Sequence, residues 1–150
     1  MERMNLQGLI FIACSVFLGI CNFLPIVKIT MDFLGEPEIT VAKMLPSVDG
    51  IVGLIAAGAC VVVMYSGAKL KCALAGVVSG ISCGIGLFHR VASIKAVEAA
   101  TTGITSVMNE ISGSTSASTV TFEYSFGFYL YILAIILIIG SGFFYAMSED

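Results

Sequence analysis

Charged side chains are scarce in this sequence: Asp, Glu, Lys and Arg make up 11% of its 150 residues. Soluble globular domains carry about 25% charged and roughly 45 to 50% apolar residues, whereas 58% of this chain is hydrophobic. A soluble core in so short a chain cannot bury that much apolar side chain. Lys and Arg number only 7 and the net charge is -3, which excludes the basic surface that nucleic-acid binding requires.

Residues that carry chemistry are also few, because tryptophan is absent and His89 is the single histidine. Catalysis by a nucleophile needs a base and an orienting partner, and no carboxylate lies within one helical turn of His89. We interpret His89 as a helix-end residue at the membrane surface, with proton sensing as the alternative. The cysteines lie in or at the edges of apolar segments, without the further ligands that a zinc site needs; they are Cys14, Cys21, Cys60, Cys72 and Cys83. We therefore expect no catalytic residues, no cofactor and no metal site.

Four long apolar segments stand out, each close to the about 20 residues that a helix needs to cross a bilayer. We predict membrane spans at about residues 6–27, 49–67, 70–89 and 126–147, with outer loops at about 28–48 and 90–125, all within one domain over residues 1–150. A cleaved signal peptide or a lipoprotein signal is the competing interpretation of the first segment; we expect a retained span. The lipid bilayer is thus the first predicted partner.

The link between the second and third spans indicates the orientation. It carries Lys69 and Lys71 and no acidic residue, and short loops rich in Lys and Arg tend to remain in the cytoplasm. We therefore expect both termini in the cytoplasm and both longer loops outside.

The two outer loops have different patterns. In the first, Val27, Ile29 and Met31 alternate with polar residues before a turn at Gly35–Pro37, which is typical of a β-hairpin. In the second, residues 91–108 place apolar side chains at helical spacing. No proline separates them from the third span, so we expect the third helix to extend beyond the lipid.

A connector and a strand complete the second loop. Residues 112–119 contain only Ser, Thr, Gly and Ala, a composition typical of flexible linkers. Val120, Phe122 and Tyr124 then alternate with polar residues, which predicts a strand that pairs with the hairpin. The sequence therefore predicts an all-α membrane protein: a four-transmembrane-helix bundle with a small extracytoplasmic cap of a β-hairpin and a strand, and an extended third helix.

Three short motifs carry a resemblance. Phe23-Leu24-Pro25, Asp49-Gly50 and Gly127-Phe128-Tyr129-Leu130 resemble a group of uncharacterised small four-span proteins of bacteria, which implies the bacterial plasma membrane as the location and carries no activity to transfer. The layout is also similar to that of claudin-like tetraspans. The sequence departs from claudins because it has no Trp and no Cys in the first loop, so shared architecture does not imply claudin function.

The clearest packing signal is a glycine series in the third span, Gly76, Gly80 and Gly84, with Gly53 and Ala57 at the same spacing in the second. Small residues four apart lie on one helix face and allow another backbone to approach closely. The partner of this face is either the second span of the same chain or another protomer.

Aromatic residues lie near both ends of the fourth span. Phe128, Tyr129 and Tyr131 stand at one end and Tyr145 at the other, as in the aromatic belts that hold a helix at its depth in the bilayer. We predict that these side chains are interfacial anchors.

The interior of the predicted spans carries no charge, whereas proton relays, ion-coupled carriers and voltage sensors place charged residues at membrane depth. We therefore expect a non-enzymatic accessory or scaffold subunit that binds another membrane protein, or a tetraspan that associates with copies of itself, through its outer cap and glycine-rich helix face. The alternative is a small oligomeric channel or transporter component.

Overall fold

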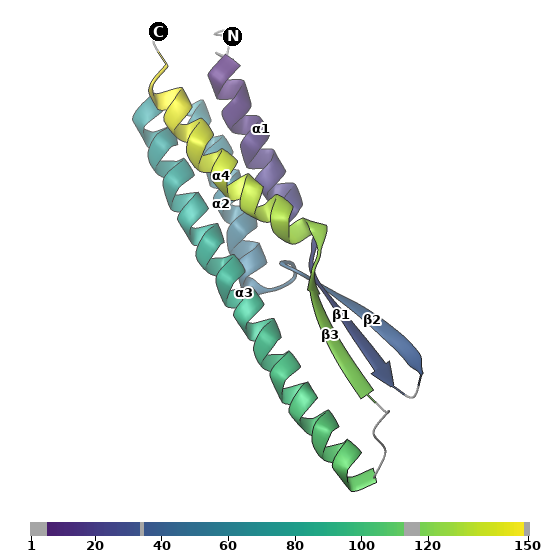
Figure 1. The fold of residues 1–150 in the computed structure, drawn as a ribbon. Helices are drawn as coiled ribbons and strands as arrows, with labels where there is room; N and C mark the ends of the chain where they lie inside the picture. The colour runs from purple at the N-terminus through teal and green to yellow at the C-terminus, as the bar shows by residue number, and fades with distance from the viewer. Residues whose placement is uncertain (1–5, 34, 113–117, 149–150) are drawn as a thin grey trace.

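The protein is a bundle of four helices with a three-stranded antiparallel sheet at one end (Figure 1). The structure is a computed structural model and describes residues 6–33, 35–112 and 118–148. Its elements, in order, are α1 (Leu6–Cys21), β1 (Pro25–Phe33), β2 (Glu36–Lys43), α2 (Val48–Tyr65), α3 (Lys69–Ser112), β3 (Ser118–Tyr124) and α4 (Phe126–Ala146). The predicted fold class is confirmed.

Three of the helices, α2, α3 and α4, are long and apolar enough to cross a membrane. The fourth, α1, has 16 residues in an apolar stretch and packs against α2 and α4. The prediction that the first helix continues to residue 27 is wrong, because β1 begins at Pro25. Proline disfavours helical backbone at the residue before it, and the side-chain Nδ2 of Asn22 donates to the Leu18 carbonyl oxygen at 2.9 Å, at the point where the helix ends.

The sheet has the order β2-β1-β3, so the strand that precedes α4 pairs with the hairpin as predicted. In the register, Ile29 of β1 lies opposite Thr40 of β2 and Phe122 of β3. The hairpin turn is tighter than the Gly35–Pro37 turn that the sequence suggested, because Pro37 already pairs with Asp32 inside the ladder. Gly35 has φ +89°, a backbone conformation that favours glycine. Residues 113–117 of the predicted connector lie outside the described residues.

Helix α3 is a single helix of 44 residues, which corresponds to a length of about 66 Å. Its first half packs against α2 and α4, and its second half runs out of the bundle beside β3 (Figure 1). The sequence therefore predicted correctly that the third helix leaves the bundle without a break.

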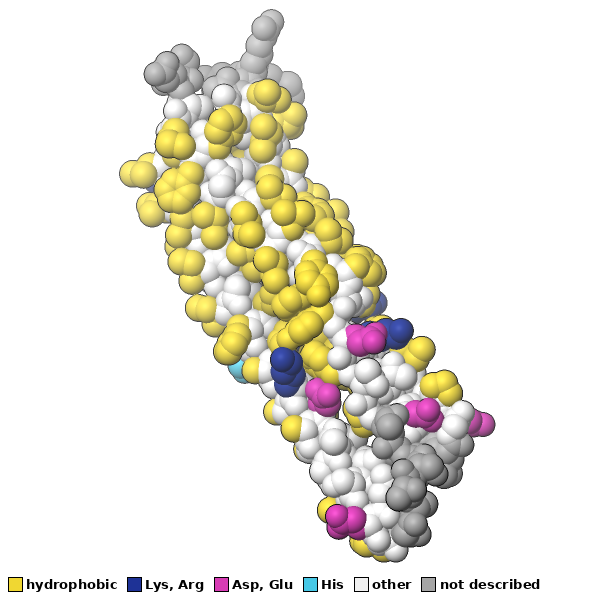
Figure 2. Space-filling model, in the orientation of Figure 1, with side chains coloured by type: hydrophobic (Ala, Val, Ile, Leu, Met, Phe, Trp, Pro, Cys, Tyr) yellow, Lys and Arg dark blue, Asp and Glu magenta, His cyan; other side chains and the backbone are white. Residues whose placement is uncertain are grey.

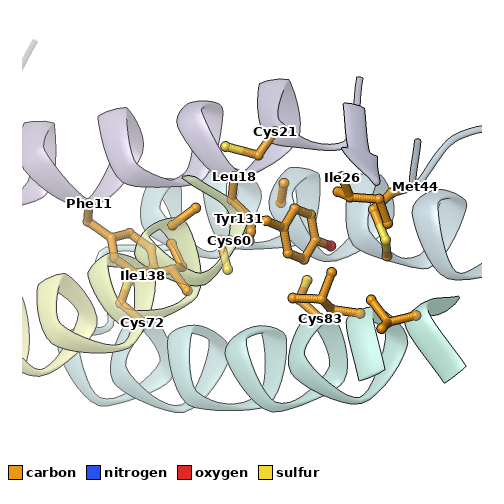
Figure 3. Close-up of a cluster of buried hydrophobic side chains, with 14 of the residues drawn as sticks. Phe11, Leu18, Cys21, Ile26, Met44, Cys60, Cys72, Cys83, Tyr131 and Ile138 are labelled. Atoms are coloured by element: carbon orange, nitrogen blue, oxygen red, sulfur yellow. The ribbon is translucent and has the colours of Figure 1, made fainter. Parts of the chain in front are cut away.

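The core lies along the axis of the bundle and extends to the base of the sheet. Large side chains from different elements meet there without exposure to solvent, among them Phe11, Leu18, Ile26, Met44, Tyr131 and Ile138 (Figure 3). On the face that Figure 2 shows, hydrophobic side chains cover the helical part, whereas the charged side chains gather toward the sheet. This division is that of a helical bundle surrounded by lipid, with its sheet outside the hydrocarbon layer.

Candidate functional site

The glycine series of α3 lies against α4. A Cβ atom on Gly76 would lie 2.8 Å from the carbonyl oxygen of Ile138, and one on Gly80 would lie 2.5 Å from Cγ1 of Ile139. On the other side of the contact, a Cβ atom on Gly142 would lie 3.2 Å from the Cys72 carbonyl oxygen. Glycine on both helices thus lets the backbones of α3 and α4 approach closely. Neither partner named in the sequence interpretation, the second span or another protomer, is the one that the structure places there.

Gly84, the third member of the series, differs from the other two. Nothing lies within 4 Å of the position that its Cβ atom would occupy. The same face of α3 is therefore packed at Gly76 and Gly80 and open at Gly84.

The small residues of α2 face the middle of the bundle. A Cβ atom on Gly53 would lie 2.6 Å from Oδ1 of Asn22 and 2.9 Å from the hydroxyl oxygen of Tyr131. Ala57 is buried one turn further along the same face. Its Cβ atom lies 3.7 Å from the position that a Cβ atom on Gly19 of α1 would occupy. Gly53 and Ala57 thus serve contacts with α1 and α4 and are not the partners of the α3 series.

Two contacts between polar side chains link separate segments inside the bundle. The Tyr131 hydroxyl of α4 donates to Oδ1 of Asn22 at 3.2 Å, and both residues are 0% exposed. Deeper in the bundle, Cys60 of α2 and Ser79 of α3 lie 3.1 Å apart between sulfur and oxygen. In the described parts of the chain, every buried side-chain nitrogen and oxygen has a hydrogen-bond partner. The arrangement joins the helices to one another.

The four predicted aromatic anchors occupy two kinds of place. Tyr129 is 62% exposed on the outside of α4, and Phe128 is partly buried with its ring stacked on Tyr124 at 4.3 Å. Tyr131 and Tyr145 instead point into the bundle, as Figure 3 shows for Tyr131. They share a helical face with Ala134, Ile138 and Ser141, at the spacing that turns a side chain toward neighbouring helices. A polar side chain such as Asn22 in the first apolar segment is the kind of sequence signal that could have indicated a buried partner for Tyr131.

At the end of the bundle nearest the sheet (Figure 1), His89 of α3 meets a carboxylate that the sequence pattern did not reveal. Its Nδ1 lies 2.9 Å from Oδ2 of Asp49, in the first turn of α2. Asp49 is 40 positions away from His89 in the sequence, so it does not lie within one helical turn of the histidine. With side-chain exposure of 70% for His89 and 23% for Asp49, solvent screens the interaction. The contact joins the start of α2 to α3.

An apolar groove opens between α3 and the junction of β3 with α4. It has a volume of about 400 Å³ and is lined by Gly84, Leu87, Phe88, Val91, Ala92, Lys95, Tyr124 and Phe128. The single charged group of the lining is the ammonium of Lys95, which lies 5.5 Å from the centre of the Tyr124 ring and 5.7 Å from that of Phe122. Only the apolar spacing on residues 91–108 hinted at one wall of this groove, since the other wall comes from β3 and α4.

A further surface lies on the part of α3 that projects beyond the bundle. Large apolar side chains remain exposed there, with Met108 at 62% and Ile111 at 82%; the others are Val97, Ile104 and Val107. In the cap, β2 is an edge strand of the sheet, on the side of β1 opposite β3, and Ile39 and Val41 are exposed on it. We refer to this apolar part of α3 together with β2 as the cap surface.

Among the described residues, no group of three or more His, Cys, Asp and Glu side chains could hold a metal ion. No family model matches the chain, and no curated protein is similar to it.

Proposed function

We propose that this protein is a subunit of the bacterial plasma membrane that acts by protein contact, and that it uses its cap surface to bind a larger membrane complex. In this proposal α1 also crosses the bilayer, both termini are cytoplasmic and the sheet is outside. The observation that carries the proposal is the set of exposed apolar side chains on the projecting part of α3.

The distance of those side chains from the end of the bundle is the reason why this observation supports the proposal. Asp49, His89 and Arg90 mark the outer end of the bundle, and Phe88 is the last residue of α3 before them. Met108 lies 20 residues beyond Phe88, or about 30 Å along the helix axis. The headgroup layer is only about 5 to 7 Å thick on each side of the hydrocarbon, so lipid does not cover Met108 or Ile111. Apolar patches that remain exposed to water commonly mark protein-protein contacts.

The glycine-rich helix face has a smaller part in this proposal than the sequence suggested. Gly76 and Gly80 are already covered by α4 of the same chain, so they are available to a partner only if the bundle opens. The edge of β2 supports the cap surface instead, because an outer strand presents unpaired backbone groups that a strand of another protein can join.

The proposal is tested with a charge placed on the cap surface. Replacing Met108 with Glu should prevent the contact, because a carboxylate would be buried against an apolar partner. Ser106→Glu, on the same projecting helix and exposed in the monomer, adds the same charge at a polar position and serves as the matched control. The measurement is the mass of the assembly extracted in mild detergent, together with cross-linking from a photoreactive side chain at position 108.

We expect the unaltered protein and Ser106→Glu to give one larger assembly with a cross-linked protein, and Met108→Glu to give a chain of 15.7 kDa alone. A cross-link between identical chains would identify self-association in place of an accessory role. If position 108 cross-links to no protein and the unaltered chain is monomeric, the proposal is wrong. Flux through proteoliposomes that depends on Asn22 would favour the alternative, a small oligomeric channel or transporter component.

A further inference from the structure

In the orientation proposed above, the groove between α3 and the β3–α4 junction lies at the outer boundary of the membrane, for which Phe88 is the marker. Gly84 is four residues before Phe88 and Lys95 is seven residues after it, so the groove extends from about 6 Å inside this boundary to about 10 Å outside it. Its inner part is therefore in contact with acyl chains, and its outer part lies at the level of the lipid headgroups.

The inner part has the shape and composition for an acyl chain. Leu87, Val91 and Phe128 provide apolar walls, and the inner end stays open because Gly84 has no side chain. Nothing lies within 4 Å of a Cβ atom at Gly84, so the opening is not filled by α4. A volume of about 400 Å³ is within the usual range of small-molecule sites, about 300 to 1,000 Å³.

The outer end has a positive charge. Side chains of a helix lean toward its N-terminus, and α3 runs outward from the membrane, so the Lys95 side chain leans back toward the lipid. Its ammonium lies over Tyr124, two residues before α4 begins. This position is at the membrane boundary, where phosphate groups are found.

The charges around Lys95 leave it available to an anion. Glu123 alternates with Phe122 and Tyr124 and so points to the other face of the sheet, opposite Lys28 of β1 in the register. Glu98 is the nearest carboxylate along α3, and no carboxylate in the described parts of the chain forms an ion pair with Lys95. On the other side of α3, Arg90 donates from Nε to the Lys43 carbonyl oxygen at 3.3 Å, so Lys95 is the one cation of the groove.

From this geometry we infer that the groove is a binding site for an anionic phospholipid of the outer leaflet. One acyl chain lies along Leu87 and Phe128, and the phosphate meets the ammonium of Lys95. The site is independent of the proposed protein contact, because the cap surface lies further along α3 and on β2.

Quenching of a single tryptophan by brominated lipid tests the inference, since the chain has no Trp of its own. Phe88→Trp places the reporter on an exposed residue of the groove lining. Tyr129→Trp places it at a similar depth on α4, exposed and outside the lining. Each variant is reconstituted into phosphatidylcholine vesicles that contain either brominated phosphatidylglycerol or brominated phosphatidylcholine at the same fraction.

We expect phosphatidylglycerol to be preferred about fivefold at the Phe88→Trp reporter, as one cation near an anionic lipid provides, and no preference at Tyr129→Trp. Adding Lys95→Gln should remove the preference, whereas Lys43→Gln, a neutralised Lys on β2, should retain it. Adding Gly84→Leu should lower quenching by both lipids, because its side chain occupies the groove.

Three results would overturn the inference. One is equal quenching by the two lipids at Phe88→Trp, which is the behaviour of ordinary surrounding lipid. Another is a preference of the same size at Tyr129→Trp, which would reflect the overall surface charge. The third is a preference that survives Lys95→Gln. Soluble glycerol phosphate should not compete; if it did, the site would recognise the phosphate alone.

Discussion

Alanine substitutions along the glycine series of α3 should differ in their effects, although all three glycines lie on one helix face. A Cβ atom at position 76 would be 2.8 Å from the Ile138 carbonyl oxygen, which is fixed backbone. To restore an ordinary contact of about 3.4 Å, α3 and α4 must separate locally by about 0.6 Å. Overpacking of this kind costs about 1 to 3 kcal/mol. We expect Gly76→Ala to lower the free energy of unfolding by that amount.

The other two positions provide graded controls. At Gly80 the nearest atoms are Cγ1 and Cδ1 of Ile139, at 2.5 and 2.6 Å, and this side chain can change its rotamer at a cost of about 0.5 to 1.5 kcal/mol. At Gly84 the new methyl group meets nothing within 4 Å, so Gly84→Ala should be neutral, or more stable by up to about 1 kcal/mol because Ala favours a helix.

The assay is reversible unfolding in mixed micelles of a mild detergent and dodecyl sulfate. The fraction of unfolded protein is measured by its cleavage with a protease. The expected order of stability is Gly84→Ala, then Gly80→Ala, then Gly76→Ala. The difference between the first and last variants isolates the packing effect, because both replace Gly with Ala inside the same helix. Equal stability of these two variants would refute the close approach of α3 to α4 at Gly76.

Two further predictions concern the buried tyrosine and the orientation. Tyr131→Phe leaves Oδ1 of Asn22 without its donor inside the bundle, so the free energy of unfolding in the same assay should fall by about 1 kcal/mol. Tyr129→Phe, on the exposed side of α4, should have no effect. Equal effects of the two substitutions would contradict the inward position of Tyr131. If the termini are cytoplasmic, Ser106→Cys on intact cells should react with a membrane-impermeant maleimide. Ser66→Cys, in the α2–α3 turn, should react only after the membrane is permeabilised. The reverse result would show that the orientation is the opposite one.

Much of the fold could be predicted because the relevant signals are local. A run of apolar residues long enough to cross a bilayer indicates a span wherever the other spans lie. Likewise, the absence of proline after Phe88 was sufficient to predict that α3 continues, and alternation from Val120 to Tyr124 was sufficient to predict β3. The first apolar segment was predicted less well: its helix ends at Cys21, and Val27, although apolar, is part of the strand that begins at Pro25.

The candidate sites were predicted less well, since each depends on two segments that are distant in the sequence. Helical spacing showed that Gly76 and Gly80 share a face, but it did not show that α4 covers it. The same limit applied to His89, whose carboxylate partner comes from α2, and to Tyr131, which was expected at the membrane surface and is buried against Asn22.

The amino-acid sequence by itself determined that the chain carries apolar helices long enough to cross a membrane and that the third helix continues beyond its apolar part, because composition and periodicity act within one segment. Only the tertiary structure decided which helical faces meet and where they part, as they do at Gly84. These choices arise from side-chain shape and backbone approach between separate segments, and the groove with Lys95 at its mouth exists only after α3, β3 and α4 have come together.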